Sequence, residues 1–230
     1  MPSPIKLFDV SNGEVVLRLD EGHTEEVLAL KMVKFRGKNY LLSGSQDGYI
    51  WRWELSDDFR TLVEKTRIQD QSSYYVCTIS FLPNCGNKYF VAGCDEALKI
   101  YDFERAKILQ TFPDVYTSFL DCVKVLPVPL GQTNSVLLVT RGVELLREED
   151  STQLFRPNTC NLHKLTYPQK IGDEFRFETL KSFSHRDYIA NTWLMRLATN
   201  GKYILAPSSF GRIFVWEIES GSLVAVLKEH

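Results

Sequence analysis

Three side chains early in the sequence carry the groups of a hydrolase. His23, Ser43 and Asp47 supply an imidazole, a hydroxyl and a carboxylate, the set with which serine hydrolases activate a nucleophile. Two features favour a structural role instead. Related residues recur at matching positions later in the chain, whereas a catalytic set is assembled once, and the sequence contains no Gly-x-Ser-x-Gly nucleophile elbow. The sequence therefore predicts no catalytic residue and no enzyme.

The other reactive residue types form no pattern typical of a cofactor or metal site. Gly44 and Gly48 flank Asp47 as turn residues and not as a phosphate-binding loop. Carboxylates are plentiful, but no motif pairs them for acid-base work. The cysteines are odd in number and scattered, which predicts buried, reduced thiols and no metal site. They are Cys77, Cys85, Cys94, Cys122 and Cys160.

The stretch Ser43–Leu55, SGSQDGYIWRWEL, shows which elements would position these residues. A strand of small residues leads into a turn with Asp47 at its tip, and an alternating apolar strand follows that contains Trp53. His23 stands 30 residues before Trp53. Strands are expected at Val27–Val33, Tyr40–Ser43, Tyr49–Leu55 and Phe59–Glu64.

Two later units repeat this spacing, and the chain opens on half a unit. Asp95 precedes Tyr101 by six residues, as Asp47 precedes Trp53, and His185 stands 31 residues before Trp216. The expected strands are Ile5–Val10 and Val15–Leu19 in the half unit, Val76–Phe81, Tyr89–Ala92, Ala97–Asp102 and Lys107–Thr111 in the second unit, and Trp193–Ala198, Tyr203–Ala206, Arg212–Trp216 and Leu223–Leu227 in the last.

The third unit departs from the pattern. A polar segment, Arg141–Asn158, interrupts it, and His163 then takes the place of the tryptophan if its strand is the third of the unit. The polar segment has two interpretations, a mobile loop or an element that docks a partner through Phe155 and Arg156. Strands are expected at Ser118–Leu126, Ser135–Thr140, Thr159–Leu165 and Phe175–Leu180.

These units resemble WD40 repeats, which form the blades of β-propellers. The resemblance implies an all-β, WD40-type β-propeller with four four-stranded blades and a half-blade in this chain. Because a propeller protects its strand edges only when the ring closes, we expect a single incomplete domain that belongs to a seven-bladed ring or is completed by other strands. The expected repeats are 1–22, 23–66, 67–112, 113–182 and 183–230.

In that family a loop histidine, a serine or threonine, a turn aspartate and a tryptophan form a hydrogen-bonded set. Buried imidazole, carboxylate and indole N–H groups need such partners. The first full unit matches at all four places, whereas the second replaces tryptophan with tyrosine and the last lacks the aspartate, so its set should be broken. The residues assigned to this structural role are His23, Ser43, Asp47, Trp53, Asp95, Tyr101, His185 and Trp216.

Composition limits the possible partners and compartments. A net charge of −2 gives no general attraction to nucleic acid or to anionic lipid, so nucleic acid is expected only indirectly, through a complex. No apolar run approaches the roughly 20 residues that cross a bilayer. The first residues, MPSPIKLFDV, do not form a secretory signal. We therefore expect a cytoplasmic or nuclear protein without a membrane contact or a small-molecule substrate.

The remaining function class is binding to other proteins or peptides through propeller-face loops. The resemblance implies a non-catalytic scaffold or recognition subunit of an intracellular complex, or alternatively a substrate receptor of a ubiquitin ligase. Aromatic and arginine side chains on these loops are the types that dominate interface energy. The candidates are Tyr49, Tyr75, Tyr116, Arg141, Phe155, Arg156, Arg186, Tyr188, Phe210 and Arg212.

Overall fold

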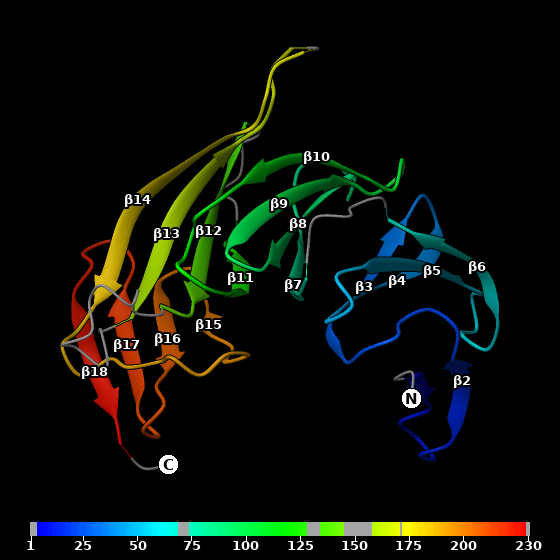
Figure 1. The fold of residues 1–230 in the computed structure, drawn as a ribbon, viewed down its shortest axis with the longest axis horizontal. Helices are drawn as coiled ribbons and strands as arrows, with labels where there is room; N and C mark the ends of the chain where they lie inside the picture. The colour runs from blue at the N-terminus through cyan, green and yellow to red at the C-terminus, as the bar shows by residue number, and fades with distance from the viewer. Residues whose placement is uncertain (1–3, 69–73, 128–133, 145–157, 171, 229–230) are drawn as a thin grey trace. The chain divides into compact units, whose positions relative to one another are not determined.

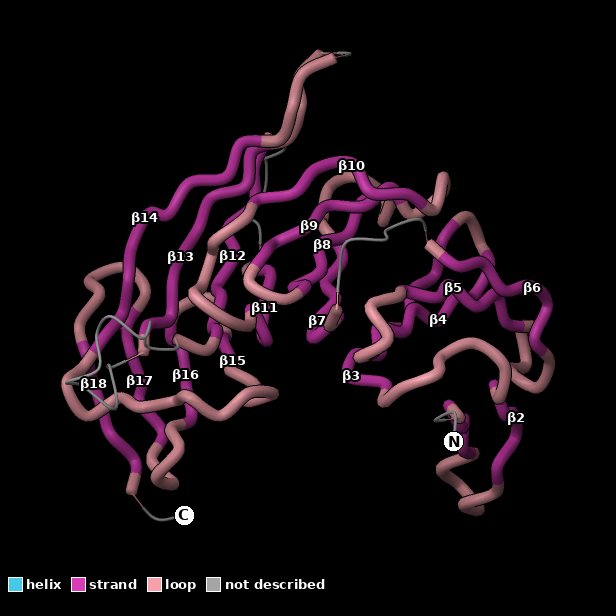
Figure 2. Tube along the Cα trace, in the orientation of Figure 1, coloured by secondary structure: helices cyan, strands magenta, loops and turns pink. Residues whose placement is uncertain are grey.

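The computed structural model describes residues 4–68, 74–127, 134–144, 158–170 and 172–228 (Figure 1). Within these ranges every regular element is a β-strand, and no helix occurs (Figure 2). The chain folds into two compact units, the first made of residues 1–95 with 99–111 and the second of residues 96–98 with 112–230.

The first compact unit contains a two-stranded hairpin and two four-stranded antiparallel sheets. In each four-stranded sheet the strands pair in sequence order, so that each is a simple meander. The hairpin is β1 (Ile5–Phe8) and β2 (Val15–Leu19). The first sheet is β3 (Val27–Phe35), β4 (Lys38–Ser45), β5 (Ile50–Leu55) and β6 (Leu62–Arg67), and the second is β7 (Val76–Phe81), β8 (Tyr89–Cys94), β9 (Ala97–Asp102) and β10 (Lys107–Phe112).

The β3–β4 hairpin closes on a tight turn that its sequence favours. Arg36 and Gly37 both have positive φ, 48° and 83°, and Phe35 pairs with Lys38. A two-residue loop with left-handed φ at both positions matches the twist of antiparallel strands, and glycine adopts that region without steric cost. The turn therefore fixes the register that sets Ser43 opposite Leu30.

The outer strand of this sheet begins later than predicted. The sequence predicts a strand at Phe59–Glu64, but β6 runs from Leu62 to Arg67. Phe59 has φ 59°, outside the extended region. Its N–H donates to the Ser56 carbonyl oxygen over 3.0 Å, which places Phe59 in the turn before β6.

An aromatic core joins the two four-stranded sheets of the first compact unit. β7 packs against β3 and β4 of the preceding sheet. The Phe90 and Tyr101 rings stack with centroids 4.9 Å apart, and Phe103 contacts Tyr40 edge to face at 5.2 Å. Phe90, Tyr101 and Phe103 are fully buried, so aromatic packing fixes the middle strands β8 and β9 of this sheet against the β3–β6 sheet.

The second compact unit contains two further four-stranded antiparallel meanders. Its core gathers Phe183, Tyr188, Phe214 and Trp216, each at most 1% exposed. The first meander is β11 (Leu120–Val125), β12 (Ser135–Gly142), β13 (Thr159–Thr166) and β14 (Arg176–Ser184). The second is β15 (Ala198–Thr199), β16 (Tyr203–Pro207), β17 (Ile213–Glu217) and β18 (Leu223–Leu227).

Two predictions in this compact unit were wrong. The inner strand expected at Trp193–Ala198 is reduced to β15, two residues long, because the chain before it turns at Leu194, whose φ is 62°. The segment predicted to be polar from Arg141 onward begins inside β12, which extends to Gly142. Residues 145–157 of that segment, including Phe155 and Arg156, lie outside the described residues.

The predicted fold class is confirmed. All four full repeats are four-stranded antiparallel sheets of the propeller-blade type, and the half repeat is the two-stranded sheet β1–β2. Closure into a seven-bladed ring stays a prediction.

Candidate protein-interaction site

The four matching residues of the first full repeat form a continuous chain of hydrogen bonds. Trp53 Nε1 donates to Ser43 Oγ over 2.8 Å, and Ser43 Oγ lies 2.7 Å from His23 Nε2. His23 Nδ1 lies 2.9 Å from Asp47 Oδ2. Because a carboxylate only accepts hydrogen bonds, Nδ1 donates to Asp47; in the tautomer with its proton on Nδ1, Nε2 accepts the Ser43 hydroxyl proton. Each group in the chain therefore donates to the next.

Asp47 also ties two loops together at the end of the sheet. Its carboxylate accepts the N–H of Thr24 over 2.9 Å and that of Tyr49 over 3.0 Å. The loop before β3 and the turn between β4 and β5 are thereby held side by side. Gly22 is required beside them because a Cβ at this position would collide with the Trp53 indole.

This arrangement has the connectivity of a catalytic triad but not its accessibility. The Ser43 side chain is 0% exposed, and its oxygen is held between His23 and the Trp53 N–H. A nucleophile must reach the reacting carbon of its substrate, and a serine buried in this way cannot do so. The contacts of the set tie the loop before β3, β4 and β5 to one another.

A second chain of hydrogen bonds, in the second compact unit, uses different residue types. The Tyr116 hydroxyl lies 3.0 Å from Thr140 Oγ1, which lies 2.8 Å from His163 Nε2. β13 is the third strand of its sheet, so His163 stands where Trp53 stands in β5. His163 Nδ1 lies 3.0 Å from Thr179 Oγ1. Burial lowers the pKa of His163 to about 4, so the ring is neutral at pH 7.

The sheet β7–β10 keeps only part of the set. Asp95 accepts the backbone N–H groups of Tyr74 and Tyr75, each over 2.9 Å, and so still ties the preceding loop to its turn. The Tyr101 hydroxyl lies 3.6 Å from Cys94 Sγ, a buried pair of weak partners. The aspartate and the aromatic residue therefore serve separate contacts in this sheet.

In the last sheet the histidine and the tryptophan are also separated. His185 Nδ1 accepts the Asp187 N–H over 3.1 Å, closing a local turn. Trp216 is held by packing, stacked on Phe214 at 5.6 Å and edge to face with Tyr188 at 5.0 Å. No hydrogen bond joins His185 to Trp216 among the described residues.

The predicted partner-contacting residues differ widely in exposure. Phe210 is 66% exposed, and Arg186 is exposed as well. Both belong to loops at one end of the β15–β18 sheet, where Ser209 N–H donates to the Ile189 carbonyl oxygen over 2.8 Å. The half-buried candidates are Tyr49, Tyr75 and Arg212.

Three of the predicted contact residues are not on the surface. Tyr116 is 3% exposed, and Arg141 and Tyr188 are fully buried. Tyr116 belongs to the hydrogen-bonded chain with Thr140, and burial raises the pKa of its hydroxyl well above the usual value. Tyr188 packs against Trp216. Their residue types suit an interface, but these side chains contact the fold and are closed to a partner.

Arg141 forms a buried ion pair that the sequence did not predict. Its guanidinium donates to the Asp121 carboxylate and to the carbonyl oxygen of Thr192, the latter over 2.7 Å. Both charged side chains are 0% exposed. Burial raises the pKa of Asp121 to about 6 even though Arg141 opposes the shift. The signal that could have indicated this pair is the presence of an acidic residue, Asp121, and a basic residue, Arg141, within two otherwise apolar predicted strands, LDCVKV and SVLLVTRG.

Metal-binding and membrane-spanning features are lacking in the part of the chain that the structure describes. Its residues contain no group of three or more histidine, cysteine, aspartate or glutamate side chains that could hold a metal ion. Within the same residues, no helix is long and apolar enough to cross a membrane.

Comparisons with known proteins find WD-repeat similarity at low identity. The chain is 24% identical to autophagy-related protein 16 of Arabidopsis thaliana over 232 residues, which cover 97% of this chain and 37% of that protein. It is 38% identical to WD repeat-containing protein 1 of Gallus gallus over 50 residues, 22% of this chain and 8% of that protein. No family model matches the chain. The chain thus spans well under half the length of the curated relatives it matches.

Proposed function

We propose that this chain is a non-catalytic, WD-repeat-type module that binds other proteins through the loops at one end of its sheets. The observation that supports this proposal most is the difference in exposure between the core residues and the loop residues of the β15–β18 sheet. Tyr188 and Trp216 are fully buried and fix the framework, whereas Phe210 and Arg186 project from loops of the same sheet into solvent. Exposed aromatic and arginine side chains on a rigid support are the groups that anchor protein interfaces.

Several observations support this proposal over the alternatives. The Ser-His-Asp set is closed to a substrate, and the names of the two relatives, autophagy-related protein 16 and WD repeat-containing protein 1, name no enzyme activity. Neither name points to a ubiquitin ligase, so the substrate-receptor alternative is not taken further. The name of the first relative makes autophagy machinery the first place to look for partners, in the cytoplasm or nucleus.

A paired-variant experiment tests the proposal. The tagged chain is compared with a Phe210→Ala, Arg186→Ala variant and with a Val224→Ala control, which removes a 51% exposed apolar side chain from β18. Proteins captured from cells by each form are quantified by mass spectrometry. At least one protein should be retained by the wild type and the control and lost by the loop variant.

The folded state of each variant is checked first by its thermal unfolding temperature. The substituted side chains are exposed, so all three forms should unfold within a few degrees of one another. If the loop variant folds normally and captures the same proteins in the same amounts as the control, the proposed loop surface is wrong.

A further inference from the structure

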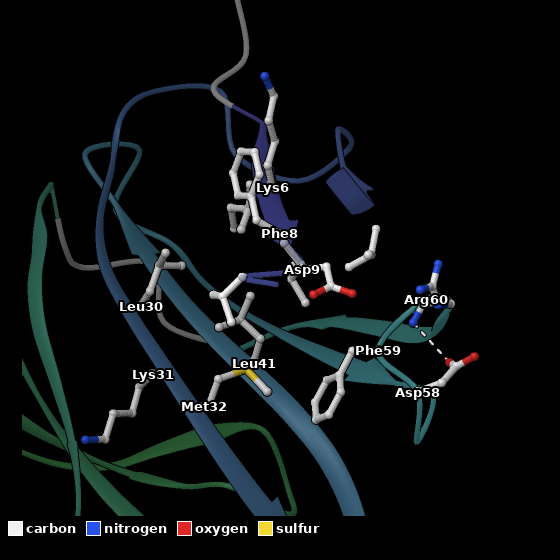
Figure 3. Close-up of a pocket in the computed structure, with 14 residues that line it drawn as sticks. Lys6, Phe8, Asp9, Leu30, Lys31, Met32, Leu41, Asp58, Phe59 and Arg60 are labelled. Carbon is white, nitrogen blue, oxygen red and sulfur yellow. Dashed lines mark hydrogen bonds between the residues drawn. The ribbon is translucent and has the colours of Figure 1, made fainter. Parts of the chain in front are cut away.

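Exposed apolar side chains near the start of the chain do not by themselves indicate a partner. Leu30 and Met32, which are 55% and 45% exposed, line a groove of about 650 Å³ beside β1 (Figure 3). In the expected ring, the strands that complete the half repeat pack in this place. Contacts between two complete four-stranded sheets do not depend on those strands, and the β11–β14 and β15–β18 sheets share such contacts.

The loop between β14 and β15 belongs to the proposed binding surface. Residues 185–197 form this loop and adopt neither helix nor strand, and they include the exposed Arg186. The middle of the loop is nevertheless buried, since Tyr188 and Ala190 are 0% exposed. Buried backbone N–H and C=O groups need hydrogen-bond partners. A loop without regular strand pairing must obtain them from other segments of the chain.

Asn158, which directly precedes β13, supplies several of these partners. Its backbone N–H donates to the Tyr188 carbonyl oxygen over 3.0 Å. Its side-chain Oδ1 accepts the Ala190 N–H over 2.7 Å, and its Nδ2 donates to Asn191 Oδ1 over 2.7 Å. Asn158 is itself 0% exposed. One buried asparagine of the preceding sheet therefore holds the loop at three of its residues.

Arg141 of β12 holds the same loop slightly further along the chain. One terminal nitrogen of its guanidinium donates to the Asp121 carboxylate, and the other donates to the carbonyl oxygens of Ala190 and Thr192. The planar guanidinium carries its donors in a fixed fork, so it can bind the carboxylate and both carbonyls at once. Together with Asn158, it fixes the course of the backbone from residue 188 to residue 192.

The held loop in turn contacts the turn that carries Phe210. The Ser209 N–H donates to the Ile189 carbonyl oxygen over 2.8 Å, and Ser209 Oγ lies 3.3 Å from Thr192 Oγ1. Phe210 directly follows Ser209, and Arg186 lies three residues before Ile189. The positions of both exposed side chains therefore depend on the course of the loop.

We infer that Asn158 and Arg141 are positioning residues of the proposed binding surface. They hold the 188–192 backbone and so set where Arg186 and Phe210 stand, but they are buried and contact no partner themselves. A surface that is rigid before binding loses less conformational entropy on binding. Loosening the loop should therefore weaken binding even when the exposed side chains are unchanged. The inference rests on the proposed function and adds what gives that surface its shape.

Hydrogen exchange followed by mass spectrometry tests this positioning in the free protein. In Asn158→Ala the Ala190 amide loses its acceptor, so the slowly exchanging amides of residues 185–197 should exchange about ten-fold faster than in the wild type. Peptides from β16 and β17 should exchange at the wild-type rate, because the sheet itself stays folded. Asn161→Ala is the matched control. It removes a 9% exposed asparagine of β13 whose amide donates to the Tyr116 hydroxyl instead of to this loop.

Arg141→Lys separates loop positioning from the stability of the buried ion pair. Lysine keeps a positive charge beside Asp121, but its single nitrogen does not form the planar fork that also reaches the carbonyl oxygens of Ala190 and Thr192. The loop should therefore exchange about ten-fold faster in this variant too. Its unfolding temperature should fall less than that of Arg141→Met, which leaves Asp121 without a counter-charge.

Asn191→Ala is a milder variant that keeps the test open if Asn158→Ala does not fold. It removes only the acceptor of the Asn158 Nδ2 group, and Asn191 is half-buried. The Ala190 N–H keeps its acceptor in this variant, so exchange of the loop should rise by about three-fold only.

Capture from cells then tests whether the held loop matters for binding. The probe is the set of proteins that the wild type retains and that the Phe210→Ala, Arg186→Ala variant loses. At limiting amounts of bait, Asn158→Ala and Arg141→Lys should each retain about five-fold less of these proteins than Asn161→Ala does. The measurement is made at a temperature at which circular dichroism shows every form to be folded.

Two results would overturn the inference alone. One is unchanged exchange of residues 185–197 in both Asn158→Ala and Arg141→Lys, and the other is faster exchange of the loop with undiminished capture. Failure of the proposed function has a different signature. In that case the wild type retains no protein that the Phe210→Ala, Arg186→Ala variant loses, and the binding surface is refuted together with the residues that position it.

Discussion

One buried imidazole in the second compact unit should contribute stability that acid removes. His163 is 1% exposed and stacks on Phe177 with ring centroids 4.5 Å apart. Burial lowers its pKa from 6.5 to about 4. As the pH falls, His163 therefore binds a proton near pH 6.5 in the unfolded chain but only near pH 4 in the folded protein. The stability that this residue contributes is complete above pH 6.5 and is lost as the pH falls toward 4.

The size of the loss follows from the two pKa values. The interval from 6.5 to about 4, at about 1.4 kcal/mol for each pH unit, amounts to about 3 kcal/mol of unfolding free energy. Asp121 acts in the opposite direction. Its pKa is raised from 3.8 to about 6, so its contribution is greatest below pH 3.8 and is lost as the pH rises through 6.

Urea unfolding followed by tryptophan fluorescence at pH 7 and pH 4 separates these opposing groups. In the wild type the two effects offset each other over much of this range. Asp121→Asn leaves His163 unopposed, so acid should destabilise this variant by about 3 kcal/mol more than it destabilises the wild type. In His163→Asn the acid loss should be smaller than in the wild type by a similar amount.

A titration of His163 in the wild type tests the same prediction without relying on the variants, either of which could fail to fold. The His163 Cε1 proton is followed by NMR in the wild type between pH 8 and pH 4. A midpoint near 6.5 would refute the reasoning, because it would mean that the ring protonates as freely in the folded protein as in water.

Three further substitutions test individual contacts by urea unfolding. Ser43→Ala should cost about 2–4 kcal/mol, because it leaves a buried indole N–H and a buried imidazole nitrogen without a partner; a loss below 0.5 kcal/mol would show that the hydroxyl is not the shared partner. Asp47→Asn should cost more than Asp95→Asn, since only Asp47 accepts from an imidazole and the φ of 51° at Asp95 suits asparagine; equal losses would contradict this. Arg141→Met should cost about 3 kcal/mol by stranding Asp121, and adding Asp121→Leu should restore part of the loss. No recovery in the double variant would mean that the pair is not the cause.

The sequence was sufficient to predict the contacts of residues that keep both the spacing and the residue types of the family's hydrogen-bonded set. His23, Ser43, Asp47 and Trp53 keep both the spacing and the chemistry of the family set, and the structure joins them as the resemblance implied. The strand pattern of the first full repeat could likewise be read from alternating apolar residues. The predicted start of β6 was three residues too early. Phe59 is a residue type common in strands, but its φ is left-handed, so it lies in the turn before β6.

The sequence was insufficient to predict a hydrogen-bonded chain whose positions are filled by other residue types than those of the family set. Tyr116 and Thr140 continue a hydrogen-bonded chain to His163, but a tyrosine in a loop reads as an interface residue. Arg141 was misplaced for a related reason. Its partner Asp121 lies on the neighbouring strand, one residue from Cys122, which pairs with Arg141. Only the strand register brings the two charges together.

The order of the strands has a consequence for how the polypeptide acquires its structure. Each four-stranded sheet is drawn from one uninterrupted stretch of chain, with every strand hydrogen-bonded to its nearest neighbours in sequence. In the β3–β6, β7–β10 and β15–β18 sheets the connections are short, so little loop entropy is lost before contacts form; the β11–β14 sheet must in addition close over residues 143–158. During synthesis, each meander can therefore begin to form from its own stretch of chain, before the next meander has left the ribosome.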